Sequence, residues 1–242
     1  MIPLRDTIPT REFPVATWLI IILNSIVFFI EISLPEKTLT ALFYHFGVVP
    51  ARYSDPLWAV SHGLTQGNYL PFLTNMFLHG GWMHFISNMW FLYLFGDNVE
   101  DRMGHVRFFV FYILSGLAAS LTHYFFNMNA TVPAIGASGA IAGVMGAYFV
   151  LFPHSRVITF IPILFIPYFI EIPAFVYLWV WFVSQLFSGT FSLLAPEAGG
   201  GIAWWAHIGG FVAGILMLPF FRKKRWSYRR YYPDEVYSDI YF

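Results

Sequence analysis

A serine surrounded by small residues is the feature of this sequence that most directly suggests chemistry. Ser138 stands in the run Gly136-Ala137-Ser138-Gly139, and further small residues follow as far as Gly146. Because glycine has no side chain, the hydroxyl and backbone N–H of Ser138 are open to a close approach. A serine hydroxyl is a weak nucleophile until a base removes its proton. The same residues also suit a purely structural helix contact, which is the common use of serine and glycine in membrane helices.

Histidine and asparagine residues supply the groups that such a serine would need. His207 lies in Trp204-Trp205-Ala206-His207-Ile208-Gly209-Gly210, and histidine is the side chain most often used as a general base. His84 and Asn88 are four residues apart, so they share one face of a helix. Both can donate hydrogen bonds to an oxyanion, as can the backbone N–H of Ser138. Together these residues predict an acyl-transfer site.

The sequence offers no acidic residue and no complete ligand set beside these groups. No Asp or Glu occurs between Asp101 and Glu171, so we expect a serine–histidine dyad without an acidic third member. His79, His84 and His207 have nitrogen ligands for a metal, but no carboxylate accompanies them. We therefore expect neither a metal nor any other cofactor.

The composition identifies the class of protein. Of the 242 residues 58% are hydrophobic and only 11% are charged, whereas about 25% are charged in an average soluble domain. Runs of about eighteen apolar residues recur, and each could cross the roughly 30 Å of bilayer hydrocarbon. The chain contains no cysteine, which excludes disulfides and cysteine nucleophiles. We expect an all-α polytopic membrane protein that binds the lipid bilayer and has no nucleic-acid partner.

Six membrane-spanning helices and one long first loop are predicted. The loop, from Pro35 to about Gly81, is rich in Phe, Tyr and Leu, which favours an amphipathic segment at the membrane interface. The segment 157–172 carries Pro162 and Pro167, so we expect it to be extended or interfacial. The turn Gly96-Asp97-Asn98 is expected to end the second span. The predicted spans are Thr17–Leu34, Trp82–Phe95, Val106–Phe125, Ile135–Phe152, Pro173–Phe187 and Ile202–Phe221.

The positions of the basic residues predict the orientation of these spans. Only Lys37 and Arg52 of the 13 Lys and Arg residues fall on the side of the first loop. By the positive-inside rule both termini are therefore cytoplasmic, and the first loop faces outward. We divide the chain into a cytoplasmic segment 1–16, a membrane domain 17–221 and a basic, aromatic cytoplasmic tail 222–242. The polar start of the chain, residues 1–15, does not have the pattern of a cleaved signal peptide.

Small residues recur at four-residue spacing on two of the predicted spans. Gly139 and Gly143 form one such face, and Gly210 and Gly214 form another. Faces of this kind let helix backbones approach closely. Packing them together would bring Ser138 to His207 at the outer ends of the two helices.

These motifs together resemble the rhomboid family of intramembrane serine proteases. Gly136-Ala137-Ser138-Gly139 is similar to its G-x-S-G motif, and Ala206 to Gly214 is similar to its A-H-x-x-G-x-x-x-G motif. His79, His84 and Asn88 match the spaced His and Asn residues of its second span. The resemblance covers about Thr17 to Phe221.

The resemblance implies a function and a role for each residue. It implies a six-helix rhomboid-like bundle with Ser138 as nucleophile and His207 as general base. It also implies that Asn88, His84 and the Ser138 N–H stabilise the oxyanion. Family substrates are single-pass membrane proteins cut in their transmembrane helix, and span five would flank their lateral route of access.

One departure from the family pattern concerns the histidine. Some members carry an aromatic residue four positions after the serine, stacked on the histidine, and here that position is Ala142. Trp204, Trp205 and Tyr148 are the candidates to orient the imidazole instead. The alternative function is a non-catalytic rhomboid-like protein that binds membrane-protein clients, although such relatives typically lack the Ser and His pair.

Overall fold

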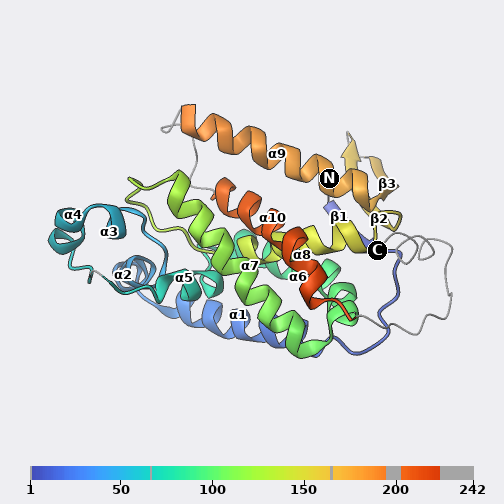
Figure 1. Cartoon of the computed structure of the whole chain (residues 1–242), viewed down its shortest axis with the longest axis horizontal. Helices are drawn as coiled ribbons and strands as arrows, with labels where there is room; N and C mark the ends of the chain where they lie inside the picture. The colour runs from blue at the N-terminus through green and yellow to red at the C-terminus, as the bar shows by residue number, and fades with distance from the viewer. Residues whose placement is uncertain (1, 66, 164–165, 195–202, 224–242) are drawn as a thin grey trace.

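The protein is mostly helical, with one small sheet at one end of the helix bundle (Figure 1). The computed structural model describes residues 2–65, 67–163, 166–194 and 203–223. The elements in chain order are β1 (Ile2–Asp6), α1 (Val15–Ser33), α2 (Glu36–Phe46), α3 (Ala51–Ser54), α4 (Pro56–Ser61), α5 (Pro71–Thr74), η1 (Asn75–Phe77), α6 (Trp82–Met103), α7 (His105–Phe126), α8 (Ser138–Leu151), β2 (Arg156–Ile163), β3 (Ile166–Pro173), α9 (Ala174–Leu194) and α10 (Trp204–Phe221).

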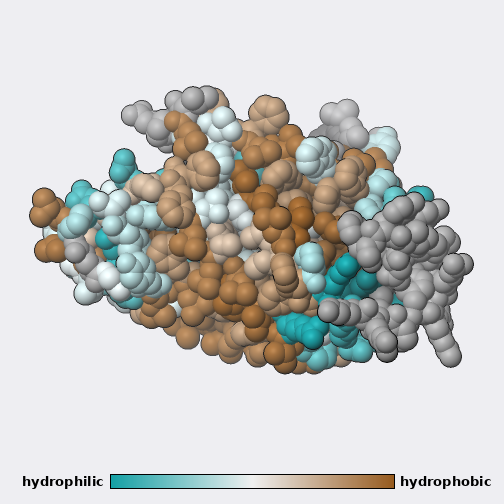
Figure 2. Space-filling view, viewed as in Figure 1, coloured by the Kyte–Doolittle hydropathy of each residue, from teal (hydrophilic) through white to brown (hydrophobic). Residues whose placement is uncertain are grey.

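Four of these helices are long and apolar enough to cross a membrane. They are α1, α7, α9 and α10, and α8 is a shorter apolar helix of 14 residues. The limits of α1, α7, α8 and α10 lie within three residues of the predicted spans. Helix α9 begins one residue after the predicted Pro173 but continues to Leu194, seven residues beyond the predicted end at Phe187. Apolar residues cover the middle of the molecule in Figure 2, while more polar residues gather toward its two ends. This distribution fits a protein embedded in a lipid bilayer. Of the predicted tail, residues 224–242 lie outside the described part of the chain.

The connection between α1 and α6 folds into short helices around a buried arginine. Arg52 is 1% exposed, and its guanidinium donates hydrogen bonds to the carbonyls of Thr65 and His45. The Val48–Ala134 bridge and the hydrogen bond from the Gly136 N–H to the Asn75 carbonyl join this connection to the start of α8. We call this end of the bundle the loop end.

The prediction that the second span ends at Gly96-Asp97-Asn98 is wrong, because α6 continues to Met103. Gly104, with a φ of +82°, ends the helix instead. The polar side chains of this last part of α6 bind the N-terminal segment rather than solvent. Glu100 accepts hydrogen bonds from the backbone N–H groups of Ala16 and Thr17, which have no partner within α1 because they lie at its start.

The sheet lies at the opposite end of the bundle, which we call the sheet end. Residues 157–163 and 166–172 are extended as predicted and form two antiparallel strands, and β1 adds to β2 as a third strand. The sequence did not predict β1. Asp6 at its end accepts a 2.5 Å hydrogen bond from the Tyr148 hydroxyl of α8. Burial raises the pKa of Asp6 to about 7, the Tyr148 hydrogen bond opposes this rise, and the Asp97 carboxylate adds to it.

The centre of the bundle is the contact between α8 and α10. A Cβ on Gly210 would overlap the carbonyl oxygen of Gly139, and a Cβ on Gly214 would overlap that of Gly143. Backbone therefore touches backbone along two turns of each helix. On its other side, α8 meets α7, where a Cβ on Gly139 would lie 2.6 Å from the Cβ of Ala119. Glycine at these positions fixes the separation of the helices that carry Ser138 and His207.

Candidate active site

Ser138 is the first residue of α8, three residues after the predicted start of this span at Ile135. The chain turns sharply before the helix at Gly136, whose φ is +128°. A Cβ at Gly136 would lie 2.6 Å from His84 Nε2 and 3.6 Å from Ser138 Oγ. Glycine is therefore required here by both the backbone conformation and the space. At a helix start, the Ser138 backbone N–H has no partner within the helix and is free to bind an anion.

The imidazole of His207 is held between two side chains. Its Nε2 lies 2.8 Å from Ser138 Oγ, and its Nδ1 lies 2.7 Å from Gln185 Oε1. His207 is in the first turn of α10, and its neighbours Ala206 and Gly210 lie against Gly139 of α8. The structure thus brings Ser138 and His207 together, although 69 residues separate them.

Gln185 on α9 is a residue of this site that the sequence analysis missed. The Gln185 side chain is buried, and it is the one amide between Ala174 and Leu194. A polar side chain within a membrane helix is a functional candidate, so its position was a usable signal. Of the aromatic candidates for orienting His207, Tyr148 instead binds Asp6 and Ser155, and Trp205 stacks on Phe126. Trp204 meets the imidazole edge to face at 6.2 Å.

A cavity of about 520 Å³ opens in front of Ser138. It is bordered by α6 on one side and by Trp181 of α9 on the other. Asn88 lines it, and the Nδ2 of Asn88 is buried without a hydrogen-bond partner. His84 lines it as well, and its Nδ1 accepts the Gly80 N–H at 3.4 Å, which leaves the ring proton to Nε2. Two unpaired donors thus face the same cavity as the Ser138 hydroxyl.

His79 lies behind His84 rather than in the cavity lining. It is 1% exposed, and its ring meets that of His84 at 5.2 Å. Its backbone N–H donates to the Glu31 carboxylate of α1. His79 therefore packs against the His84 ring from behind.

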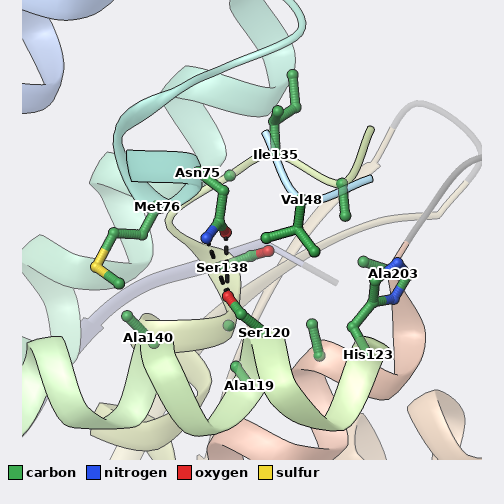
Figure 3. A pocket seen from close by; sticks show the side chains of 15 residues that line it. Val48, Asn75, Met76, Ala119, Ser120, His123, Ile135, Ser138, Ala140 and Ala203 are labelled. Atoms are coloured by element: carbon green, nitrogen blue, oxygen red, sulfur yellow. Dashed lines mark hydrogen bonds between the residues drawn. The ribbon is translucent and has the colours of Figure 1, made fainter. Parts of the chain in front are cut away.

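A second, smaller cavity also borders Ser138 (Figure 3). Its volume of about 20 Å³ suits a single water molecule. Asn75 and Ser120 hydrogen-bond to each other in its wall, and His123 also lines it. His123, in the last turn of α7, is only 9% exposed. Three polar side chains, those of Asn75, Ser120 and His123, thus share this cavity with Ser138, among mostly small and apolar residues.

Comparison with known proteins places this site in a family. The Rhomboid domain matches residues 66–224, which is well over half of the chain. "Rhomboid protein 1, mitochondrial" of Saccharomyces cerevisiae is 30% identical over 149 residues, 58% of this chain and 38% of that protein. "Putative rhomboid protease YdcA" of Bacillus subtilis is 30% identical over 114 residues, 46% of this chain and 57% of that protein.

A mammalian relative shows the same kind of partial match. "Presenilin-associated rhomboid-like protein, mitochondrial" of Bos taurus is 25% identical over 167 residues, 66% of this chain and 40% of that protein. The chain thus spans well under two thirds of the length of these relatives. The matched domain includes both Ser138 and His207 as well as His84 and Asn88. From the extent of this domain match, the chain belongs to the rhomboid family.

Proposed function

We propose that this protein is an intramembrane serine endopeptidase that cleaves transmembrane segments of single-pass membrane proteins. The observation that carries the proposal is the 2.8 Å hydrogen bond between His207 Nε2 and Ser138 Oγ beside the large cavity. Membership of the rhomboid family, which includes a relative named as a putative protease, supports it.

In this mechanism Ser138 Oγ attacks the carbonyl carbon of the scissile peptide bond. His207 Nε2 takes the hydroxyl proton as the bond forms and then passes it to the leaving amine. A water molecule, activated by His207 in the same way, hydrolyses the ester on Ser138. The small cavity beside Ser138 supports this step, since it has the volume of one water molecule.

Three donors stabilise the oxyanion in this mechanism. They are the Ser138 N–H at the start of α8, Asn88 Nδ2 and His84 Nε2–H. The unpaired state of Asn88 Nδ2 supports this role. A buried donor without a partner costs stability, and binding of the oxyanion explains why such a donor is present here. The glycine at 136 supports it too, since a side chain there would fill the space beside His84 Nε2.

The substrate helix enters the cavity sideways between α6 and α9 in this proposal. Six spans then cross the membrane, α6 and α8 being the two that are not among the four long apolar helices. Both termini are cytoplasmic, the loop end faces outward, and the protein resides in the cell membrane. The uneven distribution of Lys and Arg supports this orientation.

Cleavage of a defined substrate by the reconstituted protein tests the function. The full chain and a membrane-anchored substrate are placed in phosphatidylcholine vesicles, and cleavage is followed by gel electrophoresis. Ser138→Ala and His207→Ala should each lower kcat by about 10⁴-fold or more. Ser61→Ala and His62→Ala remove the same groups from the exposed helix α4 and its end, and should cleave like the wild type. Cleavage that survives Ser138→Ala would refute the proposal, and substrate binding without any cleavage would favour a client-binding role.

A further inference from the structure

The hydrogen bonds of Gln185 determine which way its amide faces. Its Nε2 lies 2.9 Å from Ser184 Oγ and 3.3 Å from the Trp181 carbonyl oxygen. A carbonyl oxygen can only accept, so the amide nitrogen must face it, and the amide oxygen must face His207. Turning the amide over would bring two carbonyl oxygens together.

This orientation also fixes the proton on the imidazole. Since Gln185 Oε1 can only accept, His207 Nδ1 carries the proton and donates it across 2.7 Å. The other ring nitrogen, Nε2, then holds a lone pair directed at Ser138 Oγ, 2.8 Å away. Gln185 thus selects the one neutral tautomer of His207 that can accept the proton of Ser138.

We propose that Gln185 is a positioning residue that holds His207 in this tautomer only while α9 is seated on α10. The proposal rests on the proposed protease function. Position 142 is an alanine, so no aromatic residue there can orient His207. In this proposal the amide of Gln185, from a different helix, has that role. The dyad is therefore aligned by the same helix that borders the large cavity.

The packing of α9 supports a link between its position and the dyad. Leu178, Phe182, Gln185 and Gly189 follow one another at spacings of three and four residues, so they form one face of α9. Phe182 stacks on Phe211 of α10 at 4.8 Å. A Cβ on Gly189 would lie 3.3 Å from Ile208 and 3.4 Å from Trp204, so α9 and α10 are close here.

The opposite face of α9 has no such packing. Val176, Trp179, Val180 and Phe187 are each about half exposed or more, as is expected for side chains in contact with lipid. The end of α9 toward Leu194 is therefore held mainly by α10, and Gln185 is the polar contact in that seam. If α9 moves aside to admit a substrate helix, the Gln185–His207 hydrogen bond breaks. Catalysis then requires α9 to return to its seat on α10.

An amide has an advantage over a carboxylate at this position. Gln185 is 6% exposed, and an ion at such a site would be costly unless it were paired. The amide fixes the tautomer without introducing a charge. A glutamate of the same length retains the acceptor oxygen, whereas a methionine of the same length removes it.

The test compares wild type with Gln185→Met, Gln185→Glu and Gly189→Leu in phosphatidylcholine vesicles with a membrane-anchored substrate. Gln185→Met should lower kcat by about 10²-fold, since general base catalysis contributes 10²–10⁴-fold, with KM within twofold of wild type. Gln185→Glu should recover most of this loss. Gly189→Leu leaves the amide intact but displaces α9, and should also lower kcat. Thr190→Val, an exposed change on the same helix, should have no effect.

A second measurement does not depend on cleavage. In the ¹⁵N spectrum of protein labelled in its histidines, the His207 signals are assigned from their absence in His207→Ala. Wild type should show His207 with the proton on Nδ1, and Gln185→Met and Gly189→Leu should lose that preference.

The two measurements separate failure of this proposal from failure of the proposed function. A wild type that does not cleave refutes the protease function, and the spectrum then decides alone whether Gln185 positions the ring. An unchanged Nδ1–H signal in Gln185→Met would overturn the positioning role. In an active wild type, kcat within twofold for Gln185→Met would overturn it as well.

Discussion

At the scale of single residues, candidate groups with a distinctive type and spacing could be identified from the sequence, whereas the contact of Gln185 with His207 could not be. The neighbouring glycines indicated Ser138 as a candidate, and the four-residue spacing of His84 and Asn88 placed both on one helix face. Gln185 is a lone amide on another helix, so no local pattern connects it to His207. Their contact depends on how α9 packs against α10, which is a property of the folded bundle.

Asn88→Ala should separate activity from stability. Asn88 Nδ2 has no hydrogen-bond partner, and the Asn88 side chain lines an open cavity. Its removal therefore breaks no hydrogen bond and creates no enclosed cavity in the core. We expect kcat to fall by about 10²–10³-fold, as for loss of an oxyanion donor, with little change in KM. The melting temperature in detergent should stay at the wild-type value or rise. Unchanged kcat would remove Asn88 from the oxyanion site, whereas a large loss of stability would indicate a structural role.

At the scale of elements, the apolar helices could be predicted from the sequence. The polar contacts between the end of α6 and the N-terminal segment could not. Gly96-Asp97-Asn98 looks like a turn because such residues usually face water. Here Asn98 Nδ2 donates to the Ile8 carbonyl and Asp101 accepts from the Arg11 and Glu12 N–H groups. The N-terminal segment takes the place of water, and so α6 continues.

The contact between α8 and α10 should tolerate no side chain at its glycines. In Gly214→Ala the new Cβ would overlap the backbone oxygen of Gly143, which cannot rotate away. We expect a loss of about 1–3 kcal/mol in the free energy of unfolding, as for overpacked cores. Val212→Ala changes an exposed position on the same helix and serves as the control in thermal unfolding in detergent. Equal melting temperatures for the two variants would contradict the close backbone contact.

The joint between β1 and α8 should make stability depend on pH. The folded protein holds the Asp6 proton up to about pH 7, while the unfolded chain releases it near its ordinary pKa of 3.8. Folding therefore takes up a proton between these values, and the contribution of Asp6 to stability falls as the pH rises through this window.

Asp6→Asn tests this dependence, because it keeps an acceptor for the Tyr148 hydroxyl and removes the charge. The variant should gain in melting temperature over wild type as the pH is raised from 5 to 8. A difference between the two proteins that is the same at both pH values would contradict the raised pKa.

At the scale of the whole molecule, the charge distribution predicts which end faces outward. The absence of cysteine makes this directly measurable, since single cysteines can be introduced without removing others. Val60 in α4 and Val106 in α7 are 68% and 78% exposed and lie near the loop end and the sheet end.

In intact bacterial cells, a membrane-impermeant maleimide should label Val60→Cys but not Val106→Cys. After lysis it should label both, which controls for reactivity. Labelling of Val106→Cys alone in intact cells would reverse the proposed orientation.

Activation of Ser138 by His207 can be tested by covalent labelling of the serine. The detergent-solubilised full chain is treated with a fluorophosphonate, which reacts with activated serines, and the site of the adduct is mapped by mass spectrometry. We expect one adduct per chain, on Ser138, and its loss in His207→Ala while that variant remains folded. No adduct in folded wild type, or an adduct on Ser138 that forms equally fast in His207→Ala, would contradict it.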